Sequence, residues 1–241
     1  MKFFDIQTEE EYPIFLDECN NTEKNKKFAF IINKYHSYKK FNPGPTRRIH
    51  WLIYESETTK LIGAIGLSSA TIAIKCRDDY IGWNKEQRIK NLGMIANNSR
   101  FCIIPNKSIL KNIGSMILKQ LSIVGSKRWK EKYGGMLSMI ETYVQIERND
   151  EYNEHKERNG SVYRASNWIE IGHTSGNSIR KAPLSSWKKE SGIRGELARN
   201  NPKLAMERYG YGGKEYIVSK SPIKIMFIKS LVWNWKKILL S

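Results

Sequence analysis

Cysteine is scarce in this sequence, and a long apolar run is missing. The three cysteines, Cys19, Cys76 and Cys102, show no CxxC spacing, which excludes a disulfide framework and a zinc site of the finger type. Residues 1–25 contain no basic segment followed by an apolar run, so no secretion signal is predicted. These absences predict a cytoplasmic protein.

Acidic residues are also few, because 24 Asp and Glu stand against 41 Lys and Arg and leave a formal net charge of +17. Such an excess predicts a polyanionic partner, of which nucleic acid is the commonest. Residues 1–25 are the exception, with seven acidic and two basic residues. This acidic segment either shields an anion site, faces a partner, or is a solvated helix end.

The length of 241 residues allows one large domain or two small ones, and 40% hydrophobic residues exclude a disordered chain. We predict an acyltransferase-like domain with N-terminal helices over residues 1–180. Residues 181–241, with thirteen basic and four acidic residues, form a basic C-terminal extension that packs on the same domain. Lysines interrupt its last predicted helix, 221–240, and this excludes a membrane span.

Apolar periodicity predicts both helices and strands. A capping box at Thr8 and Glu11 predicts a helix that contains Phe15 and Leu16. Two β-prone segments with a polar loop between them predict a hairpin. The principal predicted elements are the hairpin strands 48–54 and 60–67, helices 26–35, 70–78, 84–95 and 108–124, strands 100–104, 136–144 and 169–172, and a short helix at 161–168. This order predicts an α/β fold, a GNAT-like central mixed sheet flanked by helices, as in acyl-CoA N-acyltransferases.

Four segments carry a more specific pattern. They are Tyr35-His36, Arg77-Asp78-x-x-Ile81-Gly82-Trp83 with Arg88, Asn97-Asn98-Ser99-Arg100-Phe101, and Gly160-Ser161-Val162-Tyr163-Arg164-Ala165-Ser166-Asn167-Trp168 with Gly172. In this order they resemble the family of DruA, the Druantia anti-phage protein, roughly over residues 33–174. The last two segments also resemble Mom-like proteins, which hypermodify adenine in DNA.

The resemblance implies an acyltransferase-like fold, an acyl-CoA donor, DNA as substrate and the adenine N6 atom as acceptor. Acetyl-CoA is the expected donor, and other proteins of a defence system are expected partners. Iron has candidate ligands in His36 and Glu141, but no metal-ligand spacing supports it. We therefore predict no metal site.

An acyl-CoA site needs backbone N–H groups at a helix start to hold the diphosphate. Lys111, Gly114 and Ser115 are candidates for this role, although the usual two-glycine loop is missing. A glycine used for close helix packing is the alternative. Asn167 follows Tyr163 by four residues, so both share one helix face, and Asn167 is a further candidate for donor binding.

Glu141 is the candidate general base, because a carboxylate in an apolar strand is costly unless it is paired or protonated. The alternative is a structural ion pair with Arg100 or Arg77. Strand alternation places Tyr143 and Gln145 on the same face as Glu141. The resembled families have aspartate at the position of Gln145, and an amide cannot take up a proton as a carboxylate does.

Tyr163 is the candidate acid that protonates the departing thiolate, by resemblance to acyltransferases; a core tyrosine is the alternative. Tyr35 and His36 are candidate catalytic residues at a helix end. Arg77, Trp83 and Arg88 combine cations with an aromatic face, as phosphate and base contacts require. A buried Arg77–Asp78 ion pair with Trp83 in the core is the competing interpretation. The full set of candidate substrate or DNA contacts is Asn98, Arg100, Arg77, Trp83, Arg88, Tyr143, Arg180 and Lys181.

Three functions follow from these observations. The first is a DNA-modifying transferase that acts on adenine N6 in a flipped or single-stranded base. The second is a non-catalytic nucleic-acid-binding subunit of an anti-phage system. The third is an acetyltransferase that acts on protein or RNA.

Overall fold

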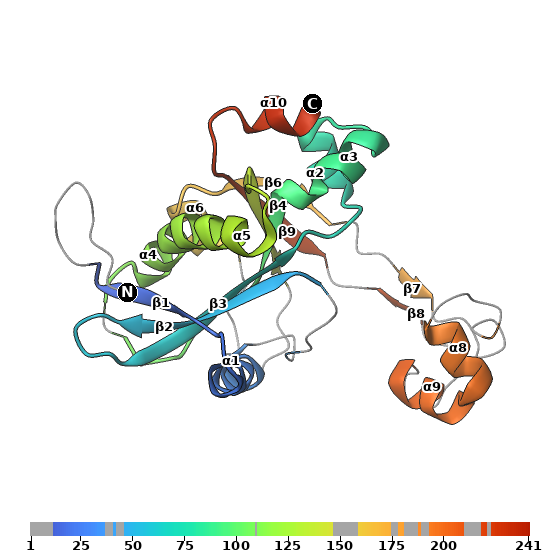
Figure 1. Ribbon diagram of the computed structural model, residues 1–241, viewed down its shortest axis with the longest axis horizontal. Helices are drawn as coiled ribbons and strands as arrows, with labels where there is room; N and C mark the ends of the chain where they lie inside the picture. The colour runs from blue at the N-terminus through green and yellow to red at the C-terminus, as the bar shows by residue number, and fades with distance from the viewer. Residues whose placement is uncertain are drawn as a thin grey trace. The chain divides into compact units, whose positions relative to one another are not determined.

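The computed structural model describes residues 12–36, 41, 46–108, 110–146, 159–174, 178–180, 188, 193–209, 218–220 and 223–241 (Figure 1). The chain divides into two compact units. The first contains Met1–Thr174 and Lys224–Ser241, and the second contains Ser175–Ile223. The first unit thus takes back the last part of the segment that the sequence assigned to a C-terminal extension.

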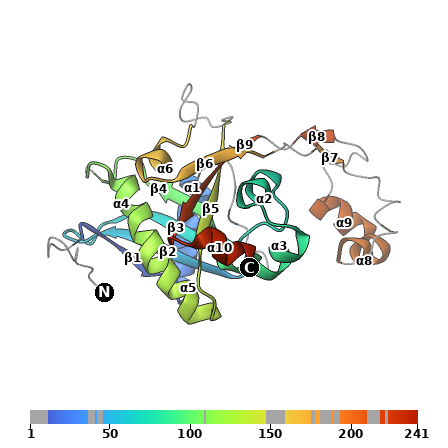
Figure 2. The ribbon, with the colours of Figure 1, turned by 90° about the horizontal axis from the view of Figure 1, so that it is seen from above.

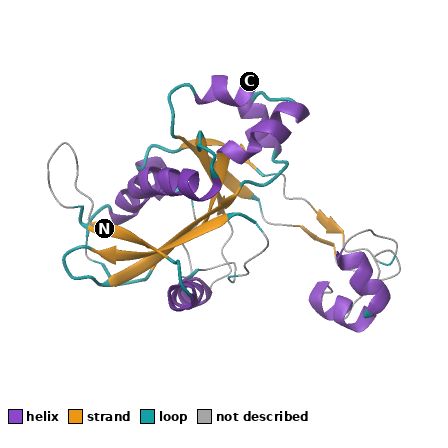
Figure 3. Ribbon diagram, in the orientation of Figure 1, coloured by secondary structure: helices purple, strands orange, loops and turns teal. Residues whose placement is uncertain are grey.

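A seven-stranded sheet forms the centre of the first unit, in the order β1-β2-β3-β4-β5-β9-β6 (Figure 3). The strands are β1 Ile14–Glu18, β2 Arg48–Glu55, β3 Leu61–Ser69, β4 Ile95–Ile103, β5 Met139–Gln145, β6 Ile169–His173 and β9 Lys224–Ser230. Neighbouring strands are antiparallel except for the parallel pair β4 and β5. The predicted mixed sheet with flanking helices is confirmed.

Helices cover both faces of this sheet (Figure 2). They are α1 Thr22–Tyr35, α2 Lys75–Ile81, α3 Lys85–Asn91, α4 Ile113–Gln120, α5 Ser126–Tyr133, α6 Ser161–Ala165 and α10 Trp235–Leu240. A π-helical turn, Leu121–Gly125, joins α4 to α5. The predicted start of α3 is confirmed, because Asn84 and Gln87 form a capping box.

Alternation along the strands separates two sides of the core. On the α4–α6 side, Ala96 and Ile140 join Trp129, Tyr163 and Phe227. The opposite side holds one cluster under α2, α3 and α10, which includes Ile95, Met139, Ile81, Trp83 and Leu239. A further cluster on that side packs Phe28, Ile31 and Ile32 of α1 against Leu52, Ala64 and Cys102. The sheet therefore has an α4 face and an α2 face.

Two predicted helices are strands in the structure. Phe15 and Leu16 lie in β1, which pairs with β2 at one edge of the sheet. Ile225 to Ile228 lie in β9, where they pair with both β5 and β6. The apolar run is buried between two strands, so tertiary pairing outweighs its helical spacing. No described helix is long and apolar enough to cross a membrane.

The second unit follows β6 in the chain and precedes β9. A short antiparallel pair, β7 Ser178–Arg180 and β8 Val218–Lys220, belongs to it together with helices α8 Ile193–Asn200 and α9 Pro202–Tyr209. Within the first unit, the Thr174 N–H donates to the Lys224 carbonyl at 2.9 Å. This hydrogen bond closes the β6–β9 hairpin at the point where the second unit begins and ends.

Candidate active site

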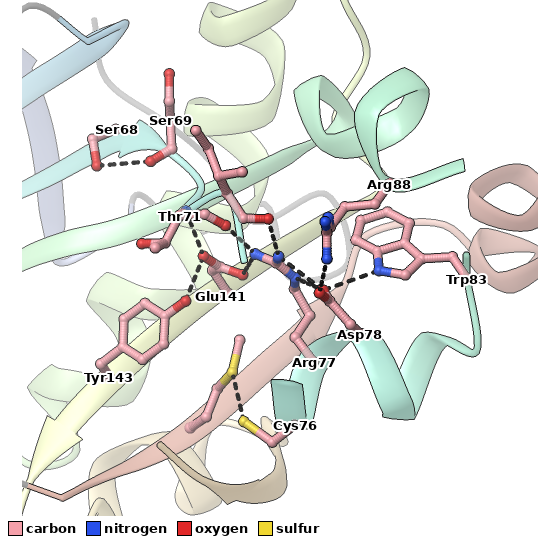
Figure 4. Close-up of polar contacts among 12 residues, drawn as sticks. Ser68, Ser69, Thr71, Cys76, Arg77, Asp78, Trp83, Arg88, Glu141 and Tyr143 are labelled. Atoms are coloured by element: carbon pink, nitrogen blue, oxygen red, sulfur yellow. Dashed lines mark hydrogen bonds and ion pairs between the residues drawn. The ribbon is translucent and has the colours of Figure 1, made fainter. Parts of the chain in front are cut away.

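Glu141 of β5 is completely buried and paired with Arg77 of α2, which is also completely buried. The Arg77 Nη1 atom lies 3.0 Å from Glu141 Oε2 (Figure 4). Glu141 Oε1 accepts from the Tyr143 hydroxyl at 2.8 Å and from the Thr71 N–H at 3.3 Å. Burial raises the pKa of Glu141, and the opposing effects of Arg77 and these hydrogen bonds do not cancel it.

Asp78 is the second anion around Arg77. Its Oδ1 atom accepts from Arg77 Nη2 at 2.9 Å and from the Trp83 indole N–H at 2.9 Å. Its Oδ2 atom accepts from Arg88 Nη1 at 2.8 Å. Burial alone raises the pKa of Asp78, but the hydrogen bonds from Arg88, Trp83 and Arg77 outweigh it and lower that pKa. We call these six residues, Arg77, Asp78, Trp83, Arg88, Glu141 and Tyr143, the Arg77 network.

The Arg77 network brings together five sequence-predicted site residues and Asp78. Of the two arginines that the sequence left open as partners of Glu141, Arg77 makes the ion pair. Trp83 is 7% exposed, and the Arg77 guanidinium lies 5.5 Å from its ring centre. Arg77 also donates to the carbonyls of Thr71 and Ile72. The buried ion pair with Trp83 in the core is therefore the arrangement observed.

Tyr163 lies on the opposite face of the sheet from Glu141. Its hydroxyl is 3.4 Å from Thr142 Oγ1, and the same Thr142 hydroxyl donates to the Asn98 carbonyl at 3.1 Å. The Tyr163 ring stacks on Phe227 with ring centres 5.6 Å apart. Consecutive residues of β5, Glu141 and Thr142, thus serve the two faces.

The pairing of β4 with β5 ends at Asn97 and Glu141. Beyond this point β4 continues along β3 and β5 continues along β9, so the two parallel strands part. We call residues 97–98 and 141–142 the β4–β5 fork. Asn98 is 4% exposed there, and neither Oδ1 nor Nδ2 of its side chain has a hydrogen-bond partner among the described residues.

A β-bulge at the fork changes which side chains share a face. The register shifts between Gly66 and Leu67, which pair with Arg100 and Asn98. Ser99 is thus the extra residue of β4. Asn98 lies on the α4 face with Ala96, whereas Arg100 lies on the α2 face with Cys102. Simple alternation would have put Asn98 and Arg100 on one face.

The proposed donor site at α4 has mixed support. A Cβ atom on Gly114 would lie 2.5 Å from Val162 Cγ2, so this glycine allows α4 to pack against α6, the alternative left open by the sequence. Lys111 is exposed, and Asn112 precedes α4 in a left-handed conformation without capping it by its side chain. The first turn of α4, with Ser115, thus fits an anionic group. Asn167 is exposed at the end of α6.

The remaining candidates lie apart from the fork or beyond what is described. Tyr35 and His36 end α1, where the His36 N–H donates to the Ile32 carbonyl, and α1 packs in its own part of the core. Arg180 lies in β7, and Lys181 lies outside the described residues. In the described part of the chain, no three His, Cys, Asp or Glu side chains form a group that could hold a metal ion.

Sequence reasoning missed three participants. Thr71 contributes a backbone N–H and a carbonyl, which no side-chain pattern announces. Thr142 is uncharged, although its place between Glu141 and Tyr143 would have put it on the other face. His50 is buried in β2, and its ring stacks on Phe28 with ring centres 4.2 Å apart.

The comparisons with known proteins agree with the family resemblance. Among solved structures, the aminoglycoside 6'-N-acetyltransferase from Enterococcus faecium is similar at 12% identity with a TM-score of 0.41, and the match covers 91% of this chain and 97% of that one. A Sphaerobacter thermophilus protein described as an acetyltransferase is similar at 10% identity with a TM-score of 0.36, and the match covers 90% and 93% of the two chains. No curated protein matches the sequence. The family model of Druantia protein DruA matches residues 5–183, and the chain belongs to this family.

Proposed function

We propose that this DruA-family chain is a cytoplasmic transferase that modifies the N6 atom of adenine in DNA, with an acyl-CoA donor. The observation that carries the proposal is the β4–β5 fork, where polar side chains face both sides of the sheet. Parting strands leave backbone groups and side chains without sheet partners, and Asn98 has both polar atoms of its carboxamide unpaired there. Such a side chain is suited to hold a polar ligand.

The two faces of the fork take different roles in this proposal. The donor lies on the α4 face, where Lys111, Ser115 and Asn167 hold it and the Tyr163 hydroxyl protonates the leaving sulfur. When bound, the donor supplies an activated acyl carbonyl. The acceptor base lies on the α2 face, where Glu141 takes up its proton. Arg77 and Trp83 are buried, so we assign them to holding Glu141, while Arg88, Arg100, Arg180 and Lys181 remain proposed DNA contacts.

Nucleoside mass spectrometry tests the proposal directly. Purified protein is incubated with acetyl-CoA and single-stranded DNA, and DNA from cells with and without the gene is digested in parallel. We expect an acylated adenosine that Tyr163→Phe lowers by about 100-fold. Tyr133→Phe, outside the fork, is the matched control. An unchanged adenine profile both in cells that carry the complete defence system and with the purified protein would refute the transferase.

A non-catalytic nucleic-acid-binding subunit is the second candidate function. The observation that favours it is the pairing of Glu141 with Arg77, together with Gln145 at the position of the family aspartate. An enzyme that has lost turnover would keep this buried pair for stability alone. Salt-dependent DNA binding without any modified adenosine, even with the other proteins of the system present, would support this function.

A further inference from the structure

Glu141 cannot be reached directly by a substrate, because its side chain is completely buried. The described contacts of its carboxylate are the Arg77 guanidinium, the Thr71 N–H and the Tyr143 hydroxyl. A guanidinium does not release its proton in a protein, and a backbone amide does not titrate. Of these three contacts, only the Tyr143 hydroxyl can therefore pass a proton to Glu141.

Tyr143 is placed to do so by the strand itself. Residues two apart on a strand share a face, so β5 fixes the 2.8 Å contact between the Tyr143 hydroxyl and Glu141 Oε1 (Figure 4). Tyr143 is partly exposed, whereas Glu141 is not. Tyr143 thus joins the buried carboxylate to the outer part of the α2 face.

The Arg77 network also allows Glu141 to become neutral. Arg77 donates Nε and Nη2 to Asp78 Oδ1 as well as Nη1 to Glu141, so it keeps one anionic partner when Glu141 is protonated. The other charged or titratable groups nearby are Arg88, paired with Asp78, and the Cys76 thiol. Protonation of Glu141 therefore leaves no buried cation unpaired, the situation that destabilises most.

We propose that Tyr143 and Glu141 form a proton relay for the acceptor amine. In this step the new N–acyl bond forms as the thioester C–S bond breaks. The acceptor nitrogen gives one proton to the Tyr143 oxygen, while the Tyr143 hydroxyl proton passes to Glu141 Oε1. The departing sulfur takes its proton from Tyr163 on the other face. The relay rests on the proposed transferase function and assigns Tyr143 as the residue that contacts the acceptor.

Steady-state kinetics of Tyr143→Phe, Glu141→Gln and the double variant test the relay. We expect each single variant to lower kcat by about 100-fold with little change in KM, and the double variant to be no slower than the slower single variant. The limb of the wild-type pH–rate profile that reports the base should be missing in both. Tyr80→Phe, which removes a hydroxyl elsewhere on α2, should keep the wild-type rate. Multiplicative losses, or a wild-type kcat for Tyr143→Phe, would overturn the relay.

An infrared titration of the free protein separates the relay from the proposed transfer reaction. Spectra of wild type minus Glu141→Gln are recorded from about pH 8 to about pH 4, with circular dichroism in parallel. The relay requires the Glu141 carboxyl to gain a proton while the fold is intact, and requires Tyr143→Phe to shift that titration. A carboxylate that stays ionised until the protein unfolds would overturn the relay. If the titration succeeds and no donor supports transfer, the proposed function fails and the proton pathway stands.

Discussion

At the scale of single residues, the central feature is an arginine shared by two carboxylates. Arg77 neutralises Glu141 from one side and Asp78 from the other, and all five of its described hydrogen bonds go to carboxylates or backbone carbonyls. A buried charge is tolerated only when it is paired and hydrogen-bonded. The network therefore fixes α2 against β5 and holds Glu141 in a single position.

Removal of Arg77 tests this dependence. Arg77→Ala leaves buried Glu141 without its cation and weakens the surroundings of Asp78, so we expect a loss of about 3–5 kcal/mol in the free energy of unfolding. Urea denaturation followed by tryptophan fluorescence measures it. Lys75→Ala, which breaks the solvent-exposed Lys75–Asp79 pair on the same helix, should leave the denaturation midpoint unchanged. Equal effects of the two substitutions would contradict the role of the network.

His50 makes stability depend on pH in a defined window. Burial, followed by the nearby charges of Arg48, Arg100 and Lys132, lowers its pKa from 6.5 to about 4. Between these values the unfolded chain binds a proton that the folded protein does not, so stability present above pH 6.5 is lost as pH falls toward 4. The loss amounts to about 3 kcal/mol.

The measurement is the urea midpoint at several pH values across this window. His50→Phe should remove this part of the pH dependence while it keeps the ring stacked between Phe28 and Phe41. If the variant loses stability with the same slope as wild type, other groups cause the dependence.

At the scale of elements, the α6 segment is set by the glycine that begins it. Gly160 has φ of +72°, and a Cβ atom there would lie 2.4 Å from Phe227 Cε2. Phe227 belongs to β9 and stacks on Tyr163, so the start of α6, the ring and the proposed acid are packed together. The glycine thus allows the close approach that positions Tyr163.

Two glycine substitutions separate backbone strain from this close contact. Gly160→Ala should lower the free energy of unfolding by about 2–4 kcal/mol, because it adds overpacking to left-handed strain. Gly134→Ala, at φ of +77° with nothing within 4 Å of the added Cβ, should lower it by about 1 kcal/mol. Thermal or urea unfolding of both variants decides. Similar losses would show that the Phe227 contact does not matter.

At the scale of the whole molecule, the positive charge has a separable contribution. Residues 175–223 hold ten basic and four acidic residues and form the second unit. The β6–β9 ladder and the Thr174–Lys224 hydrogen bond lie in the first unit, so the sheet closes without this segment. The chain therefore offers a clean way to test how the charge is used.

Replacement of residues 175–223 by a short Gly/Ser turn should leave the far-ultraviolet circular dichroism of the first unit intact. The affinity for DNA should fall, and the slope of log affinity against log salt should become less steep, because each lost phosphate contact removes about one unit of slope. Fluorescence anisotropy with a labelled single strand at several salt concentrations measures both. An unchanged salt slope would contradict a role of this unit in phosphate binding.

The sequence by itself determined what depends on neighbours along the chain. The β2–β3 hairpin and the Asn84–Gln87 cap are local, because polar turns and capping side chains act within a few residues. The motif spacing also led to the right family and to an α/β sheet. The positions of Glu141, Arg77 and Tyr163 near strands or helices were accessible in the same way.

Only the tertiary structure decided how these residues combine. It made Ile225–Ile228 a strand between β5 and β6, because burial between two neighbours outweighs helical spacing. It selected Arg77 rather than Arg100 as the partner of Glu141, and the bulge at Ser99 placed Arg100 and Asn98 on opposite faces. Such pairings join residues far apart in sequence, and one extra residue in a strand reverses the faces that alternation predicts.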